Sequence, residues 1–150
     1  MLSLPQTAEY ALRAVCYIAE REGNGPVPVS EVAAALAAPQ NYLSKTLHHL
    51  GTRGVLRSVR GARGGYTLGA PGTTLRLADI VEPFLAESEH RCIMGRARCR
   101  DDAPCGAHWR WKEVKDTARA FFLELTVAEL LRNDAAAPLV RSAPAMRAAS

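Results

Sequence analysis

The hydrophobic pattern of this chain changes its period at Gly54, and this change limits the possible folds more than any other feature. Before Gly54, apolar residues recur every three or four positions, as they do on amphipathic helices. Breaks containing glycine or proline divide this part into three predicted helices, at about 5–22, 30–37 and 40–50. The second and third helices are short, and only the Ala38-Pro39 break separates them. Two short helices joined by a tight turn are typical of a helix-turn-helix.

After Gly54 the pattern predicts a β-hairpin. Residues 55–59 and 66–68 favour strands, and the turn Arg60-Gly61-Ala62-Arg63-Gly64-Gly65 joins them. The glycines of this turn accept positive φ and let the backbone approach another molecule closely. A hairpin directly behind a helix-turn-helix is a wing. The predicted fold class is therefore mainly α with a small β-hairpin wing, a winged helix-turn-helix domain followed by a long dimerisation helix.

The C-terminal half predicts a helix from about Leu77, a polar loop, and a long helix that begins between 101 and 104 and ends near Leu125. One face of the long helix carries an apolar seam like that of a coiled coil, made by Trp111, Val114, Ala118, Phe121, Phe122 and Leu125. A seam beyond a complete small domain needs another surface, so we predict a homodimer in which the same helix of a second copy covers it. Thr126 is expected to cap a last short helix.

These features divide the 150 residues into four parts. Residues 1–86 are predicted to form the winged helix-turn-helix domain, 87–105 a cysteine loop, and 106–132 the dimerisation helix and a short C-terminal helix. Residues 133–150 are rich in alanine and proline and are expected to be disordered. The sequence has no apolar run of membrane-spanning length and no signal-peptide pattern, so we expect a cytoplasmic protein without membrane contact.

Charge points to double-stranded DNA as a partner. No Asp or Glu occurs between Val32 and Ala78, a stretch that contains Lys45, Arg53, Arg57, Arg60, Arg63 and Arg76. A merely solvated face would mix acids with the bases, so this one-sided charge indicates a nucleic-acid surface. The candidate DNA contacts are Gln40, Asn41, Ser44 and Lys45 on the third helix, and Arg60 and Arg63 on the wing. Helix capping is the alternative role for the first two, and solvated loop charge for the two arginines.

A second candidate site lies in the predicted loop, where Cys92, Cys99 and Cys105 are followed by His108. Thiols stay reduced in the cytoplasm, so clustered cysteines there bind metal or perform redox chemistry more often than they form disulfides. Three thiolates with one histidine suit an iron–sulfur cluster or a zinc ion, and thiols without any metal are a further alternative. Cys16 lies on the apolar face of the first helix and is expected to be a buried small hydrophobe.

The sequence argues against an enzyme. No stretch resembles a nucleophile elbow or a phosphate-cradling loop, and the Gly64-Gly65 pair lies in a hairpin turn rather than before a helix.

The run YLSKTLHHLGTRGVLRSVRGARGGYTLG resembles the recognition helix and wing of the Rrf-type bacterial transcriptional regulators, the family that contains IscR, NsrR and RirA. The segments EYALRAV and FLELTVAELL are also similar to that family, so the resemblance extends over about residues 5–132. It implies a homodimeric DNA-binding regulator, by default a repressor. It also implies an iron–sulfur cluster on Cys92, Cys99 and Cys105 that senses nitric oxide, redox state or iron status. The alternative is a zinc-stapled or thiol-only winged-helix protein without such a switch.

The resemblance leaves two residues as candidate fourth ligands. His108 matches the histidine of IscR-like members, in which it completes a [2Fe–2S] site. Glu9 matches the acidic residue that NsrR-like members supply from the partner subunit to a [4Fe–4S] site, and we favour this cluster slightly. The simpler alternatives are an acid that complements the first turn of its helix for Glu9, and a surface residue on the long helix for His108.

Overall fold

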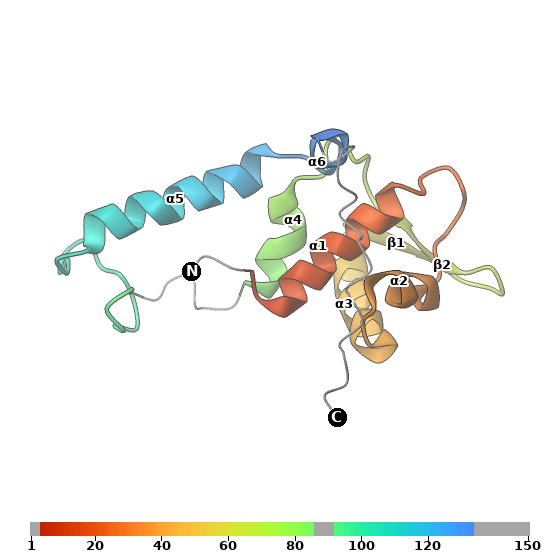
Figure 1. Ribbon diagram of the computed structural model, residues 1–150, viewed down its shortest axis with the longest axis horizontal. Coiled ribbons are helices and arrows are strands. Elements are labelled where there is room, and N and C mark those ends of the chain that lie inside the picture. Colours follow the sequence, from red (N-terminus) through yellow and green to blue (C-terminus); the bar gives the residue numbers. More distant parts are fainter. Residues whose placement is uncertain (1–3, 86–91, 134–150) are drawn as a thin grey trace, which may run out of the picture.

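The winged helix-turn-helix predicted for the N-terminal half is present in the computed structural model, which describes residues 4–85 and 92–133 (Figure 1). Helices α1 (Gln6–Ala19), α2 (Val29–Leu36) and α3 (Gln40–Thr52) pack against one another. The turn between α2 and α3 contains Ala37, whose backbone is left-handed with φ 51°. Helix α2 starts at Val29 behind Pro28, because proline already holds the φ that a helix entry needs.

Strands β1 (Leu56–Val59) and β2 (Gly65–Leu68) pair antiparallel, with Leu56 opposite Leu68 and Val59 opposite Gly65. The hairpin is joined to the helices by Val27, which exchanges two backbone hydrogen bonds of 2.9 Å with Tyr66. Gly65 is required at this junction, since a Cβ there would lie 2.3 Å from the Val27 carbonyl oxygen. The wing is therefore fastened to the body of the domain at its base.

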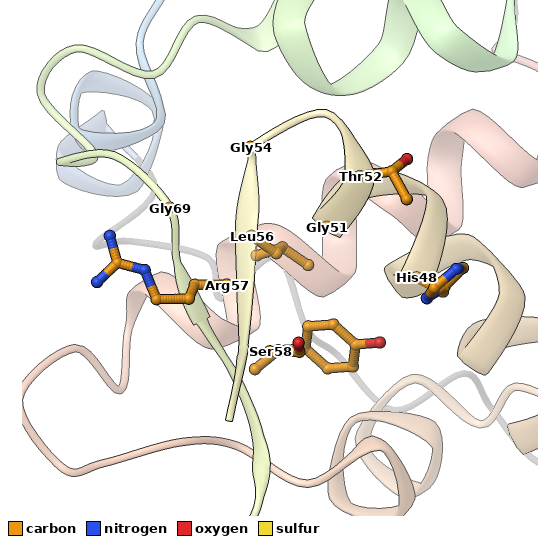
Figure 2. Close-up of a pocket in the computed structure, with 9 residues that line it drawn as sticks. His48, Gly51, Thr52, Gly54, Leu56, Arg57, Ser58 and Gly69 are labelled. Atoms are coloured by element: carbon orange, nitrogen blue, oxygen red, sulfur yellow. The ribbon is translucent and has the colours of Figure 1, made fainter. Parts of the chain in front are cut away.

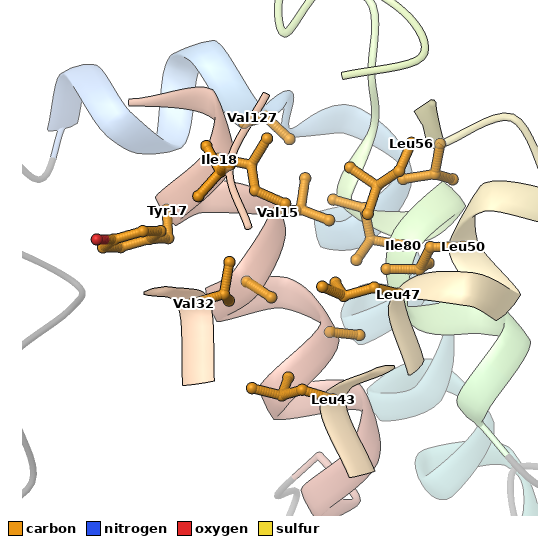
Figure 3. Close-up of a cluster of buried hydrophobic side chains, with 14 of the residues drawn as sticks. Val15, Tyr17, Ile18, Val32, Leu43, Leu47, Leu50, Leu56, Ile80 and Val127 are labelled. Atoms are coloured by element: carbon orange, nitrogen blue, oxygen red, sulfur yellow. The ribbon is translucent and has the colours of Figure 1, made fainter. Parts of the chain in front are cut away.

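One hydrophobic core holds these elements together. Figure 3 shows Val15 and Ile18 of α1 facing Leu47 and Leu50 of α3, and the full cluster also includes residues of α2, β1, α4 and α6. The side chains of Val15, Leu47 and Leu50 are fully buried, and each buried aliphatic side chain contributes about 1.5–3 kcal/mol. Cys16 is also fully buried, in agreement with its expected role.

The chain then forms α4 (Leu77–Val81) and a short 3₁₀ turn, η1 (Glu82–Phe84). We predicted one continuous helix here, but Pro83 cannot donate the hydrogen bond that would continue α4. The long helix α5 (His108–Glu124) begins later than predicted, behind Cys105 and Gly106.

The last helix, α6 (Val127–Asn133), is capped by Thr126 as predicted, since the Thr126 hydroxyl accepts a hydrogen bond from the Glu129 N–H, and Val127 is fully buried in the core. Backbone hydrogen bonds from Leu77 to Leu125 and from Val127 to Leu75, each 3.0 Å, tie the α5–α6 junction to the start of α4. The tail was predicted to begin at residue 133, but Asn133 is the last residue of α6; residues 134–150 lie outside the described residues, as do residues 87–91 of the predicted cysteine loop.

Helix α5 extends from the winged domain, and the cysteine loop lies at its far end (Figure 1). Within the described ranges, no helix combines the length and apolarity needed to cross a membrane.

Candidate nucleic-acid interface and thiol centre

The outer face of α3 carries the predicted DNA contacts. Gln40, Asn41 and Lys45 are exposed and Ser44 is half-buried, while Leu43, Leu47 and Leu50 on the opposite face are fully buried. The N-cap of α3 is Pro39, and its cap has no side-chain hydrogen bond, so Gln40 and Asn41 do not occupy the capping position. The face is therefore free to present polar groups to a groove.

The two histidines of α3 have different surroundings. His48 is exposed and falls on the same stripe as Asn41, Ser44 and Lys45, because these positions are three or four residues apart. His49 is also exposed, and its ring lies edge-on to Phe84 of η1, with 5.3 Å between the ring centroids. Helical spacing adds His48 to the candidate interface.

The wing presents Arg60 and Arg63 at its exposed tip. Within residues 4–85 and 92–133, neither these arginines nor Lys45 forms an ion pair with an acidic side chain. Their positive charge is therefore available to an external anion.

A cavity of about 410 Å³ opens between the C-terminal half of α3 and the hairpin. In Figure 2, Leu56 and Ser58 point into the space next to α3, and Arg57 points to the other side of β1. His48, Thr52 and Ser58 bring polar groups to the lining of the cavity.

The cysteine loop brings its thiols together. Cys92 Sγ lies 3.6 Å from Cys105 Sγ. Hydrogen bonding lowers the pKa of Cys92, chiefly through the backbone of Met94 and also through the thiols of Cys105 and Cys99, while burial opposes this effect. Cys92 is buried and the other two thiols are half-buried. The loop therefore stabilises thiolate, the form that binds metals.

His108 is not the surface residue considered above as an alternative. Its side chain is only 2% exposed, and its Nε2 lies 2.8 Å from Asp101 Oδ1. The second carboxylate oxygen of Asp101 accepts a hydrogen bond of 2.8 Å from Lys112 Nζ. The ammonium of Lys112 and then His108 lower the pKa of Asp101.

Glu9 is 57% exposed, and its carboxylate lies 3.5 Å from Arg13 Nη1 on the surface of α1. Figure 1 places the beginning of α1 apart from the cysteine loop of the same chain.

The residues of the loop fit an iron–sulfur cluster by their chemistry, because soft thiolates are its usual ligands. In the part of the chain that the structure describes, no three His, Cys, Asp or Glu side chains are arranged to hold a bare metal ion. Zinc accepts thiolate and imidazole ligands as well, so the ligand types suit either group.

The predicted dimerisation residues have two kinds of surroundings. Val114 and Phe121 are exposed, and Trp111 and Ala118 are half-buried. Phe122 and Leu125 instead pack against the core of their own chain. An open groove of about 560 Å³ borders the exposed seam, lined by Ile93, Gly106, Ala107, Arg110, Trp111 and Val114. The Trp111 Nε1 atom is buried beside it without a hydrogen-bond partner among the described residues.

The fold agrees with comparisons to known proteins. The family model described as "Rrf2: Iron-dependent Transcriptional regulator" matches residues 4–133. The chain belongs to the Rrf2 family. The predicted resemblance is thereby confirmed, and the relatives are regulators of transcription rather than enzymes.

Individual relatives cover most of the chain. An Aquifex aeolicus (strain VF5) protein named as an HTH-type transcriptional regulator is 34% identical over 128 residues, which are 83% of this chain and 88% of that protein. IscR of Escherichia coli O1:K1 / APEC is 25% identical over 132 residues, 88% of this chain and 82% of IscR.

Solved structures of Rrf2-type proteins share the fold. CymR (YrzC), described as the global cysteine regulator of B. subtilis, superposes with a TM-score of 0.75 at 22% identity, over 89% of this chain and 98% of CymR. IscR of T. potens superposes with a TM-score of 0.75 at 22% identity, over 94% of each chain. The mainly helical winged fold is thus confirmed.

The sequence analysis did not identify Asp101, which contacts His108, or Lys112, which donates a hydrogen bond to Asp101. An acid between two of the cysteines and a lysine one turn after His108 were the available signals.

Proposed function

We propose that this Rrf2 regulator binds a two-fold operator as a homodimer, and that an iron–sulfur cluster on Cys92, Cys99 and Cys105 controls this binding. The observation that carries the proposal is the 3.6 Å approach of Cys105 Sγ to Cys92 Sγ in a loop that also contains Cys99, at the end of α5 far from α3. When bound, the cluster supplies a group that nitric oxide, oxygen or iron loss can damage. The output is repression.

The exposed face of α3 and the tip of the wing form the proposed DNA surface. Asn41, Ser44 and Lys45 are directed away from the core, as residues that enter a major groove must be. Arg60 and Arg63 are placed to reach the adjacent backbone or minor groove. The recognition helices of two copies would then contact successive half-sites.

Helix α5 is the proposed dimer contact. Val114 and Phe121 are 40% and 52% exposed, which is unfavourable for apolar side chains on an isolated helix. A second copy that covers this seam would also close the groove beside Trp111. Phe122 and Leu125 would support the seam from the core side.

Anaerobic purification followed by iron, sulfide and visible absorption measurements tests the cluster. We expect brown protein with charge-transfer bands, and loss of both iron and sulfide when Cys92, Cys99 and Cys105 are replaced by serine. Fluorescence anisotropy with a duplex selected from a random library should then give different affinities for cluster-loaded and cluster-free protein. Colourless protein, or equal affinities, would end this proposal.

We propose Glu9 of a second copy as the fourth ligand, with a [4Fe–4S] cluster slightly preferred to [2Fe–2S]. Its support is the exposure of Glu9 and the engagement of His108 Nε2 by Asp101. Glu9→Ala should then change the visible spectrum, while His108→Ala should leave it close to that of the wild type. The reverse pattern would make His108 the ligand and favour a [2Fe–2S] cluster.

A second candidate function is a thiol switch without a cluster. Its support is the 3.6 Å separation between Cys92 Sγ and Cys105 Sγ, which allows a disulfide after a small movement. The oxidised form of Staphylococcus aureus CymR has a related fold, with a TM-score of 0.68 at 23% identity. Protein that is colourless as purified without air, yet changes its DNA affinity on oxidation, would favour this function.

A further inference from the structure

Asp101 connects the cysteine loop to α5. It lies between Cys99 and Cys105 in the sequence, and its two carboxylate oxygens contact two different residues of the helix. Oδ1 lies 2.8 Å from His108 Nε2, and Oδ2 accepts a hydrogen bond of 2.8 Å from Lys112 Nζ. His108 and Lys112 are four positions apart, so they lie on the same face of α5.

The helix side of this connection is well held. A buried imidazole is costly unless its polar atoms are hydrogen-bonded, and Asp101 supplies a partner to the buried His108. Trp109 packs edge-on against His108, with 4.7 Å between the ring centroids, and Lys112 Nζ lies 5.6 Å from the centre of the same indole. Asp101 therefore binds to groups that are already fixed on the first turns of α5.

The neighbouring acid, Asp102, has a different role. Its carboxylate pairs with Arg100, within the loop itself. Arg96 also stays within the loop, where it donates a hydrogen bond of 3.0 Å to the Ala103 carbonyl oxygen. These contacts shape the loop without reaching α5, so Asp101 and Asp102 offer a matched comparison of two adjacent exposed carboxylates.

We propose that Asp101 is a positioning residue that fastens the cysteine loop to α5 through His108 and Lys112, and so passes the state of the thiol centre to the dimerisation helix. The second half of this statement rests on the proposed function. Asp101 also occupies Nε2 of the His108 ring, which leaves only Nδ1 for any other partner.

Loop opening in the cluster-free protein tests the fastening. Trypsin cutting is followed after Arg96 and Arg98, which neither adjoin Asp101 nor pair with Asp102, and thiol labelling with a chromogenic disulfide reports the accessible cysteines of the loop in the same sample. Asp101→Ala should raise both rates by about threefold to tenfold, the range expected for losing a charged hydrogen bond at a partly exposed site. Asp102→Ala is the matched control and should change them less than Asp101→Ala. Equal rates for the two variants would overturn the proposal.

A double variant separates the fastening from general weakening of the loop. If Asp101 and Lys112 act as one connection, adding Lys112→Ala to Asp101→Ala should accelerate cutting little further. If the increase in cutting rate of the double variant equals the product of the two single increases, the two residues do not share one connection. Asp101→Glu keeps the carboxylate and should restore part of the protection.

Transmission is tested with cluster-loaded protein. Asp101→Ala should retain iron and sulfide, while the ratio of DNA affinities between loaded and cluster-free protein falls toward one. An unchanged ratio would refute transmission, and loss of the cluster itself would make Asp101 a requirement for assembly rather than a transmitter. If the wild type binds no iron, the proposed function fails. The cutting and labelling rates of the cluster-free variants would still test whether Asp101 holds the loop against α5.

Discussion

Cys92 Sγ lies 3.6 Å from Cys105 Sγ, although 13 positions separate the two residues in the sequence. A tight turn follows Cys92, in which the Gly95 N–H donates a hydrogen bond of 2.9 Å to the Cys92 carbonyl and the Cys92 N–H donates one of 3.1 Å to the Arg96 carbonyl. The same pair of thiols could hold one cofactor or form one disulfide.

Mild oxidation of cluster-free protein with hydrogen peroxide should form a Cys92–Cys105 disulfide. One peroxide would accept two electrons from the two thiols and yield two waters and the S–S bond. Cys92 should start the reaction, because its lowered pKa increases the thiolate fraction that attacks peroxide. Peptide mapping after alkylation should find Cys99 carrying the alkyl group, because its thiol remains outside the disulfide. A disulfide that includes Cys99 instead would show that the loop rearranges before it is oxidised.

The charge of the α3 face predicts how DNA affinity depends on salt. Lys45→Ala should weaken binding by about 1–3 kcal/mol if the ammonium contacts a base edge, with relaxed specificity at one position. If it contacts phosphate, binding should weaken for all sequences and the salt dependence should become shallower. Arg119→Ala on the exposed surface of α5 is the control. Titrations at several salt concentrations distinguish the two roles, and equal affinities for both variants would remove Lys45 from the interface.

Much of the fold could be predicted from the sequence because local signals agreed there. The change of period at Gly54 predicted the hairpin, and Thr126 predicted the start of the last helix. The beginning of α5 was placed too early, because Asp101 and Pro104 are also typical of a helix start. Instead the carboxylate of Asp101 contacts His108 in the first turn, a long-range preference that no local pattern records.

The candidate site was predictable as a set of residues but not as a geometry. The spacing of the cysteines indicated a ligand set, yet it could not reveal that Cys92 would be buried and its thiol hydrogen-bonded. Nor could helical periodicity show that Phe122 and Leu125 pack inward while Phe121 remains exposed, because neighbouring positions on α5 face the domain only near its end.

The close approach of Gly65 to Val27 predicts how a methyl group added at Gly65 would change the stability of the fold. In Gly65→Ala the new Cβ would lie 2.3 Å from the Val27 carbonyl oxygen, so the paired backbones must separate. We expect a loss of about 1–3 kcal/mol in the free energy of unfolding, as for other overpacked sites. In Gly72→Ala, by contrast, the nearest atom is 3.8 Å from the new Cβ, so this variant is a matched control. Urea denaturation of both variants measures the difference, and equal midpoints would contradict the close approach.

The cap of α6 predicts how stability depends on pH. The Glu129 carboxylate accepts hydrogen bonds of 2.7 Å from the Thr126 hydroxyl and 2.9 Å from its backbone N–H. These bonds lower the pKa of Glu129 below its ordinary value of 4.5, with a smaller contribution from nearby Arg132. Because the pKa is lower in the folded state than in the unfolded chain, ionised Glu129 stabilises the protein above pH 4.5. That stabilisation disappears as the pH falls through the folded-state pKa.

Glu129→Gln should therefore lower the thermal midpoint at neutral pH, and its difference from the wild type should shrink as the solution becomes acidic. The buried Val127 next to the cap couples α6 to the core, so global unfolding should register the effect. Glu113→Gln, on the exposed surface of α5, is the matched control and should show no such convergence. A Glu129→Gln deficit that stays constant from neutral to acidic pH would mean that the amide's shape, rather than the lost charge, weakens the cap.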